Sequence, residues 1–380
     1  MMVTRREVLL GCGSALAILA VSGRAAAADR KVYRVPIRLQ SRRLLVSCTI
    51  EGKGPYSLGI DTGGVTSVIQ ADLARVLDLK QRGVTPMGIA GRYDRYPMFE
   101  AREVVFGGAF RQQSVLFAGI QDAGFGRDVQ GMLAAGCLTT RDSELDFSAM
   151  EWRLMPDGGP QRAGWVAHED AIRTQKVGSP HLFGEASLGG QKLRVLLDTG
   201  APGNPLFFAK VARKAGVDLD SQNWSPATTN GKEARNYRSP VPLQIGGLTI
   251  ERPLIRVTDQ IANFIEDGLI GLPTIQRLDL ATEVKAGRLW TRPSGLPAEP
   301  DEYNMSGLWI DRKGDAIVAG LVGKGSPAEK AGIARGDRLE GYAFGQMIAR
   351  LNGRVGQQVA LSVTRGGQKR DVNLMLEDYL

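Results

Sequence analysis

The sequence predicts a mainly β protein with two duplicated lobes followed by a smaller C-terminal domain. The stretch Gly59-Ile60-Asp61-Thr62-Gly63-Gly64 returns almost unchanged as Leu196-Leu197-Asp198-Thr199-Gly200-Ala201. Each Asp is followed after the same interval of 70 residues (61 to 131 and 198 to 268) by a Gly-apolar-apolar-small motif. A repeat of this length indicates a duplicated lobe, since solenoid units are shorter. Many of the 48 glycines stand in pairs between short apolar runs, a pattern that indicates strands joined by tight turns.

The composition argues against a nucleic-acid partner. The formal charge of +8 is spread along the chain without a basic run or interleaved aromatic residues. Cys48 and Cys137, the two cysteines beyond the N-terminal leader, either pair in an oxidising compartment or remain buried thiols. Their apolar surroundings favour the buried thiols.

Residues 1–28 are predicted to be a twin-arginine signal peptide. Arg5 and Arg6 precede an apolar run that ends near Val21, and Ala26-Ala27-Ala28 supplies a cleavage site. A membrane anchor is the alternative, but the run is shorter than the ~20 apolar residues of a spanning helix. We therefore expect a periplasmic protein, exported through the twin-arginine route, with no membrane span after cleavage.

The first lobe is expected over residues 29–154. Its predicted elements are strands at 35–39 and 44–50, a turn at 52–55, a strand that ends at Asp61 and a helix at 67–79. Residues 87–97 then form a Gly-rich hairpin, which either covers a cleft or is an ordinary surface loop.

The rest of the chain divides at two breaker-rich segments. Residues 155–180 lack sustained periodicity and are predicted to be a linker, and residues 181–291 repeat the first lobe. A second linker is expected over 292–304. The last domain, 305–380, is too small for another lobe; its predicted elements include a helix at 344–351 and strands at 359–364 and 372–376.

The repeated triplet predicts a site made of two carboxylates. A single Asp-Thr-Gly is often a plain turn, but two copies with apolar lead-ins and matched spacing indicate paired half-sites. Two carboxylates held close together cannot both ionise readily, so they share a proton. One can act as general base on a water while the other acts as acid toward a carbonyl group.

Asp61-Thr62-Gly63 and Asp198-Thr199-Gly200, each followed by its apolar motif, resemble the pepsin and retropepsin class of aspartic proteases. In particular, the chain resembles bacterial aspartyl-protease-like proteins with a C-terminal PDZ domain. The resemblance implies two β lobes that meet at a cleft with both Asp residues at its floor, and no metal or organic cofactor. It also implies that Thr62 and Thr199 lock the turns together through hydroxyl hydrogen bonds. The hairpin at 87–97 corresponds to a flap, with Tyr93 and Tyr96 as candidate contacts.

Two departures from the family pattern affect the expected chemistry. Ala134 stands where the family usually has Gly, and its methyl group is expected to crowd the turn beneath Asp61. Gly64 and Ala201 offer no hydroxyl group to the carboxylates, and losing a donor to the charged form raises the lower pKa of the pair. We therefore expect a pH optimum closer to neutral than that of gastric-type enzymes.

The C-terminal segment resembles a PDZ domain through Gly325-Ser326-Pro327-Ala328 and Gly336-Asp337. The resemblance implies that the loop Ser306-Gly307-Leu308-Trp309 captures a peptide C-terminal carboxylate with its backbone N–H groups. The alternative is a PDZ fold used only for packing or dimerisation. Residues 323–328 also fit a dinucleotide-binding fingerprint, but the domain is too small for that fold.

Other chemistries lack their residues. His168 and His181 are the only histidines and are expected to be linker or surface residues, so a His-based metal site or a Ser-His-Asp triad is not expected. The chain is therefore predicted to be a single-chain aspartic endopeptidase acting on peptide or protein substrates, with a C-terminal peptide as a further ligand. The alternative is a catalytically silent peptide-binding or adaptor protein that uses the protease-like cleft.

Overall fold

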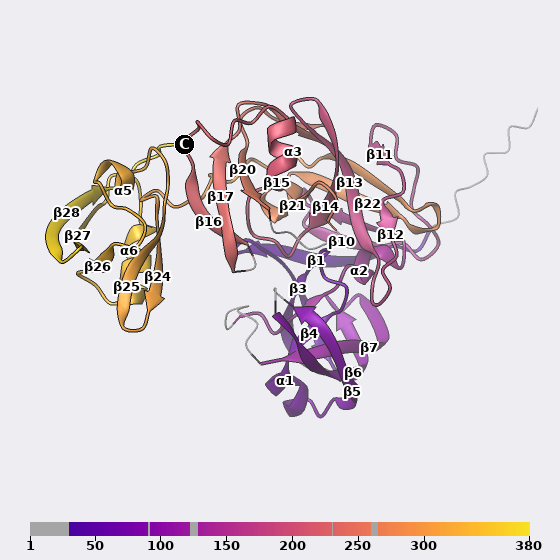
Figure 1. Ribbon diagram of the computed structural model, residues 1–380. Coiled ribbons are helices and arrows are strands. Elements are labelled where there is room, and N and C mark those ends of the chain that lie inside the picture. The colour runs from indigo at the N-terminus through magenta and orange to yellow at the C-terminus, as the bar shows by residue number, and fades with distance from the viewer. Residues whose placement is uncertain (1–29, 90–91, 122–127, 230, 260–264) are drawn as a thin grey trace, which may run out of the picture. The chain divides into compact units, whose positions relative to one another are not determined.

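The computed structural model describes residues 30–89, 92–121, 128–229, 231–259 and 265–380. The predicted signal peptide and positions 90–91 of the predicted hairpin lie outside these ranges. The protein is mainly β, as the sequence predicts, and its strands form three sheets (Figure 1). In the described part of the chain, no helix has the length and apolar character needed to cross a membrane.

The first lobe is built mostly from strands. Its elements are β1 (Tyr33–Gln40), β2 (Arg43–Ile50), β3 (Lys53–Ile60), β4 (Val68–Gln70), α1 (Ala71–Val76), β5 (Lys80–Ile89), β6 (Arg92–Phe106), β7 (Phe110–Ile120), β8 (Gly131–Leu133), α2 (Gly136–Thr139), β9 (Ser143–Asp146) and β10 (Glu151–Leu154). The strands predicted at 35–39 and 44–50 are confirmed as β1 and β2. The helix predicted at 67–79 is wrong at its start, because β4 pairs with β7 and β8 there and tertiary pairing overrides local helical spacing.

The second lobe has a comparable set of elements. They are β13 (His181–Leu188), β14 (Gln191–Asp198), β15 (Leu206–Phe208), α3 (Ala209–Lys214), β16 (Ser225–Thr229), β17 (Lys232–Arg238), β18 (Leu243–Ile245), β19 (Leu248–Ile250), β20 (Leu254–Thr258), β21 (Gly268–Gly271), α4 (Leu272–Ile275), β22 (Leu278–Glu283), the 3₁₀ turn η1 (Val284–Ala286) and β23 (Arg288–Pro293). The segment predicted as a linker, 155–180, is not structureless. It contains β11 (Val166–His168) and β12 (Ile172–Arg173), which pair with β23 and β13.

The duplication is visible in the order of the strands. From the strand that precedes each Asp, the first lobe runs β3-β8-β4-β7-β6-β5 and the second runs β14-β21-β15-β20-β17-β16. The pairs β3 and β8, and β14 and β21, are both parallel. Each Gly-apolar-apolar-small motif therefore forms the strand beside the Asp-bearing strand, which explains why the two intervals are equal.

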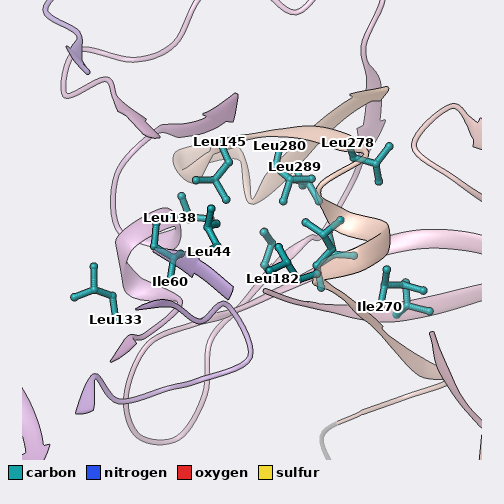
Figure 2. Close-up of a cluster of buried hydrophobic side chains, with 14 of the residues drawn as sticks. Leu44, Ile60, Leu133, Leu138, Leu145, Leu182, Ile270, Leu278, Leu280 and Leu289 are labelled. Atoms are coloured by element: carbon teal, nitrogen blue, oxygen red, sulfur yellow. The ribbon is translucent and has the colours of Figure 1, made fainter. Parts of the chain in front are cut away.

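One sheet connects the two lobes. Strands β22 and β23, from the second half of the chain, extend β9, β10 and β1 of the first half, and Leu280 pairs with Leu145 where the halves meet. The side chains behind this junction are fully buried, from Leu44 and Ile60 on one side to Leu182 and Ile270 on the other (Figure 2). Since each buried Leu or Ile contributes about 1.5–3 kcal/mol, this continuous core holds the lobes as one body.

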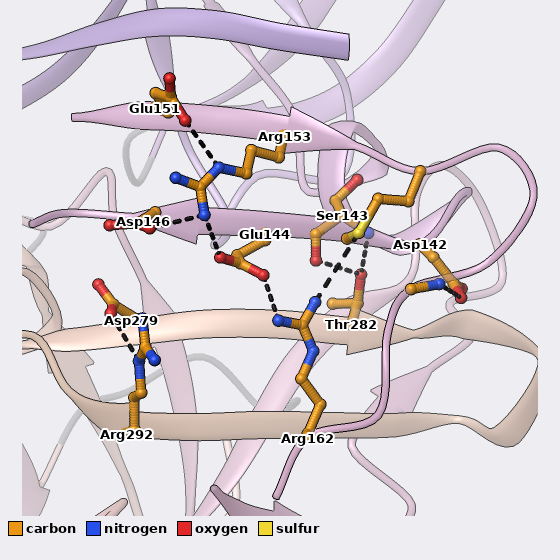
Figure 3. Close-up of polar contacts among 12 residues, drawn as sticks. Asp142, Ser143, Glu144, Asp146, Glu151, Arg153, Arg162, Asp279, Thr282 and Arg292 are labelled. Atoms are coloured by element: carbon orange, nitrogen blue, oxygen red, sulfur yellow. Dashed lines mark hydrogen bonds and ion pairs between the residues drawn. The ribbon is translucent and has the colours of Figure 1, made fainter. Parts of the chain in front are cut away.

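Ion pairs cover the same junction. Arg153 contacts Glu144, Asp146 and Glu151 at 2.7 Å each, and Arg162 contacts Glu144 from the opposite side (Figure 3). Charged groups this buried are tolerated only when they are paired. The segment predicted as a linker is therefore fastened to the sheet through Arg162.

The C-terminal segment forms its own sheet and core. Its elements are β24 (Leu308–Lys313), β25 (Ala316–Val322), α5 (Pro327–Lys330), β26 (Arg338–Glu340), α6 (Phe344–Leu351), β27 (Gln358–Arg365) and β28 (Gln368–Met375). Helix α6 confirms the helix predicted at 344–351, and β27 and β28 confirm the last two strands. Met347 and Leu351 of α6 pack with Leu308 and Ile310 of β24, which is an edge strand of the sheet.

The junction between the lobes can be tested at Thr282. Its buried Oγ1 accepts a hydrogen bond from the Ser143 N–H at 3.0 Å (Figure 3). The same hydroxyl donates to the Leu138 carbonyl at 2.7 Å. Thr282→Val keeps the shape of the side chain but leaves both backbone groups unpaired, so we expect it to lower the free energy of unfolding by about 1–3 kcal/mol. Urea denaturation measures this loss. Thr249→Val, at an exposed site on β19, is the control and should change stability by less than about 0.5 kcal/mol.

Candidate active site

The two Asp residues emerge at corresponding places in the two lobes. Asp61 directly follows β3, and its N–H donates to the Leu133 carbonyl of β8 at 2.8 Å. Asp198 ends β14 and pairs with Gly271 of β21. Each Asp therefore stands at the C-terminal end of a pair of parallel strands. Strands hold a side chain in place more rigidly than loops do.

Reciprocal hydrogen bonds join the two turns. The Thr62 N–H donates to Thr199 Oγ1 at 3.1 Å, and the Thr199 N–H donates to Thr62 Oγ1 at 2.9 Å. Each hydroxyl in turn donates at 2.6 Å to the carbonyl that precedes the opposite Asp, at Leu197 and Ile60. Because each hydrogen bond is repeated when the two turns are exchanged, an approximate two-fold axis runs between the turns.

Glycine is required where the turns meet. A Cβ at Gly63 would lie 2.3 Å from the carboxyl carbon of Asp198, and one at Gly200 would lie 2.4 Å from Asp61 Oδ1. Each carboxyl group is thus pressed against the backbone of the opposite turn. The two carboxyl groups are therefore close neighbours, and each influences the pKa of the other.

The surroundings of the pair favour a shared proton. Burial raises the pKa of Asp61, while burial and the neighbouring Asp61 carboxylate raise the pKa of Asp198 well above its usual range. Backbone N–H groups of Gly63 and Gly64 donate to Asp61 Oδ1 at 3.0 Å, and those of Gly200 and Ala201 donate to Asp198 Oδ1 at 2.9 and 3.1 Å. These four donors stabilise the charged form but do not offset burial. The pair can therefore hold one proton and one negative charge, and the titration belongs to both groups together.

Ala134 does not distort the turn beneath Asp61, contrary to the expectation from its methyl group. The Ala135 N–H donates to the Gly64 carbonyl at 2.9 Å, and the matching bond in the second lobe, from Leu272 to Ala201, is 2.8 Å. The methyl group is buried beside Ser67, whose Oγ accepts from the Ala134 N–H. The backbone hydrogen bonds beneath the Asp61 and Asp198 turns are therefore equivalent despite the difference in sequence.

The predicted hairpin is present as β5 and β6, and its two tyrosines lie in different surroundings. Tyr93 pairs with Gly88 and is 78% exposed. Tyr96 packs against the apolar cluster of Val68 and Met132, whose strands flank the Asp61 turn. Tyr96 thus contacts a cluster that adjoins the Asp61 turn, whereas Tyr93 is exposed, and the flap role of both tyrosines remains a prediction.

In the C-terminal sheet, the loop predicted to capture a carboxylate has occupied donors. The N–H groups of Ser306 and Gly307 donate to Asn304 Oδ1 at 3.1 and 3.0 Å, and the Leu308 N–H donates to Ser306 Oγ at 3.2 Å. Trp309 lies on β24, with its indole N–H directed to Asp311. A peptide carboxylate would have to displace the Asn304 side chain, and carboxylate capture by this loop stays a prediction.

Both histidines were placed wrongly by the sequence, since each is buried. His168 Nε2 lies 2.8 Å from Thr291 Oγ1, and its Nδ1 accepts from the Glu185 N–H. His181 Nε2 lies 3.1 Å from the carbonyl oxygen of Gly63, behind the Asp61 turn. Burial lowers the pKa of both rings, which favours their neutral forms. No sequence signal indicates the contact between His181 and Gly63, because it joins residues of different lobes.

The cysteines are unpaired in the structure, as their apolar surroundings favour. Burial raises the pKa of Cys48 and of Cys137 to about 12, so neither thiol ionises near neutral pH.

The reciprocal bonds predict a distinct effect of the Thr199 hydroxyl. Thr199→Val leaves the Thr62 N–H and the Ile60 carbonyl unpaired, so we expect a loss of about 2 kcal/mol or more in the free energy of unfolding. Thr199→Ser keeps the hydroxyl and should lose clearly less. Urea denaturation of both variants at pH 7 makes the comparison, and equal losses would show that the hydroxyl bonds do not hold the turns.

The raised pKa of Asp198 predicts how stability changes with pH. A carboxyl group whose pKa is higher in the folded state binds its proton more tightly there, so its contribution to stability falls as pH rises above the unfolded value of about 3.9. Asp198→Asn removes this titration and keeps an acceptor for the Gly200 and Ala201 N–H groups. We therefore expect the variant to gain stability relative to the parent at pH 7, but not at pH 3.5.

Asp218 is the control for this experiment and should behave in the opposite way. Hydrogen bonds from the Ser221 hydroxyl and backbone lower the pKa of Asp218, so its contribution is present above the unfolded value and lost as pH falls. Asp218→Asn should therefore reduce stability at pH 7 and not at pH 3.5. Thermal denaturation at both pH values compares the two variants, and curves of the same sign would contradict the assigned directions.

Comparisons with known proteins are consistent with this site. A family described as aspartyl protease matches residues 184–274, which include the Asp198 turn and β21. Proteins named "Probable CtpA-like serine protease" from Staphylococcus aureus strains COL, MRSA252 and N315 are each 32% identical over 79 residues. That stretch covers 19% of this chain and 16% of the length of those relatives. The lobe that carries Asp198 is therefore similar to aspartyl proteases, and the curated relatives are also named as proteases.

Proposed function

We propose that this protein is an aspartic endopeptidase whose reacting groups are Asp61 and Asp198. The observation that carries the proposal is the close pair of half-buried carboxyl groups, each set against the backbone of the opposite turn and held by reciprocal Thr62 and Thr199 bonds on two matched turns. The match of residues 184–274 to an aspartyl protease family supports it. Both half-sites lie in one chain, so a single molecule supplies the complete pair.

The reaction follows from the shared proton. The ionised carboxylate takes a proton from a water molecule as its oxygen attacks the peptide carbonyl carbon, and the protonated carboxyl group gives its proton to the carbonyl oxygen. The resulting tetrahedral diol then collapses. Its C–N bond breaks, the leaving nitrogen receives a proton, and the pair returns to one proton and one charge. The backbone donors at Gly63, Gly64, Gly200 and Ala201 keep both carboxyl groups oriented throughout.

The histidines do not suit a serine-protease mechanism in this chain. His168 is occupied by Thr291 and the Glu185 backbone, and His181 by the Gly63 carbonyl. The similarity to proteins named as serine proteases spans only 79 residues, and it supports a peptidase without assigning its nucleophile. The aspartic mechanism uses the groups that the fold brings together.

The proposal extends to the surroundings of the site. The β5–β6 hairpin covers an extended substrate, and Tyr96 contacts it from the apolar cluster of the first lobe. The N-terminal pattern adds that the substrates are exported proteins or peptides in the periplasm. The C-terminal sheet acts as a PDZ domain, in which the edge strand β24 beside α6 receives a peptide C-terminus.

The proposal predicts peptide cleavage that depends on both Asp residues. The purified protein, residues 29–380, should cut members of an unbiased peptide library between pH 3 and 8, with an optimum above about pH 4. Asp61→Asn and Asp198→Asn each remove one half of the proton relay, so we expect rates to fall by about 10²–10⁴-fold or more. Mass spectrometry identifies the cuts, and Asp218→Asn, on an exposed loop, should leave them unchanged.

Two results would contradict the proposal. Cuts that persist in both Asn variants would come from another group or a contaminant. A well-folded protein that makes no cuts at any pH would favour the alternative, a peptide-binding or adaptor protein.

A further inference from the structure

The two lobes place different side chains at equivalent positions next to the dyad. In the first lobe, Val68 of β4 pairs with Ala118 of β7, which also pairs with Met98 of β6. In the second lobe, Leu206 of β15 pairs with Arg256 of β20, which also pairs with Asn236 of β17. The strands correspond one to one in the duplicated order. An alanine and a methionine in one lobe are therefore replaced by an arginine and an asparagine in the other.

The first-lobe position is apolar. Ala118 is fully buried in a cluster with Leu45, Val68 and Met132, and Met98 and Tyr96 pack against it. This cluster lies apart from the main core of the lobe, under the β5–β6 hairpin. Such apolar surroundings favour contact with another apolar side chain.

The second-lobe position holds a cation. Arg256 Nε donates to Asn236 Oδ1 at 3.2 Å, and Nη1 donates to the Thr228 carbonyl at 3.1 Å. Among the residues that the structure describes, no carboxylate forms an ion pair with Arg256 and Nη2 makes no hydrogen bond. Burial lowers the pKa of this guanidinium with no opposing acid, yet an arginine stays charged in proteins. A partly buried charge without a counter-charge is costly, and an incoming carboxylate would offset that cost.

Arg256 also lies against the loop that follows Asp198. Its side chain lies on the face of β20 opposite Ile255 and Val257, which belong to the core. Its Nη1 is 3.4 Å from where a Cβ of Gly203 would stand. Gly203 follows Asp198 by five residues, and its carbonyl abuts Gly271 on the strand beside that Asp. The two-fold axis that exchanges the Asp turns also exchanges the Ala118 and Arg256 positions, so they lie on opposite sides of the dyad.

We propose that Arg256 forms an anion-binding subsite that selects substrates with an acidic side chain on the second-lobe side of the scissile bond. The substrate class is an extended peptide with Asp or Glu on that side and an apolar residue on the first-lobe side. Nη2 of Arg256 binds the substrate carboxylate, while Asn236 and Thr228 hold the guanidinium. This specificity rests on the proposed peptidase function and goes beyond it.

The test uses matched peptides that differ at one position. A peptide cut by the wild-type protein is prepared with Glu, Gln or Lys at each position flanking the cut, and kcat/KM is measured for each. At one flanking position we expect Glu to exceed Gln by about 10-fold or more, as for a hydrogen bond to a charged group. Arg256→Gln should reduce that ratio to about 2-fold or less, and Arg256→Glu should favour Lys. Arg252→Gln, which removes an exposed arginine, should keep the wild-type ratio.

The outcomes separate the subsite from the peptidase function. Cleavage without a Glu preference at any flanking position would overturn the subsite and leave the peptidase standing, with Arg256 only a support for the β16–β17 hairpin. If the wild-type protein cuts no peptide, the peptidase fails. Calorimetric binding of reduced-amide peptides with Glu or Gln at each position then tests the subsite alone, and equal affinities throughout would overturn it. The comparison of Glu and Gln peptides on the wild-type protein does not depend on whether any variant folds.

Discussion

The contact between the two Asp-Thr-Gly turns dictates how the two lobes must be placed against each other. Two carboxyl groups can be brought side by side only if nothing stands between them, and Gly63 and Gly200 leave the opposite carboxyl group just enough room. The Thr62 and Thr199 hydroxyl groups then join the turns by bonds that repeat across the two-fold axis. The interlobe strands and their shared core hold both lobes in the positions that this contact requires.

Holding the carboxyl groups together is electrostatically unfavourable when both are charged. Burial and mutual proximity raise their pKa values, and the four backbone donors only partly oppose this. The folded protein therefore holds a proton on this pair up to a higher pH than the unfolded chain does. In the proposed reaction, this proton is the one donated to the carbonyl oxygen of the substrate. The closeness of the two carboxyl groups therefore lowers the stability of the fold and, in the proposal, provides the acid.

The duplication makes the two half-sites alike and leaves their surroundings free to differ. The backbone beneath the two Asp turns is alike even where the sequences differ. Ala134 and Gly271 occupy equivalent positions, and the residue after each donates an equivalent backbone hydrogen bond. Away from the floor, symmetry is broken at Ala118 and Arg256, and at Gly63, whose carbonyl contacts His181. Under the proposed function, these differences would let a nearly symmetric pair of carboxyl groups act on an asymmetric peptide, since each side of the pair presents different side chains.

Sequence alone predicts the duplication, the strand-rich class and the two candidate Asp residues, because these depend on local patterns and their equal spacing. It also located β1, β2, α6 and the last two strands, where apolar periodicity agrees with the final packing. The folded structure was needed to show that residues 68–70 are a strand, that the segment 155–180 joins two sheets and that both histidines are buried. It alone revealed Arg256 facing Asn236 beside the Asp198 turn. These features depend on contacts between residues distant in the chain, and a pattern confined to neighbouring residues carries no information about such partners.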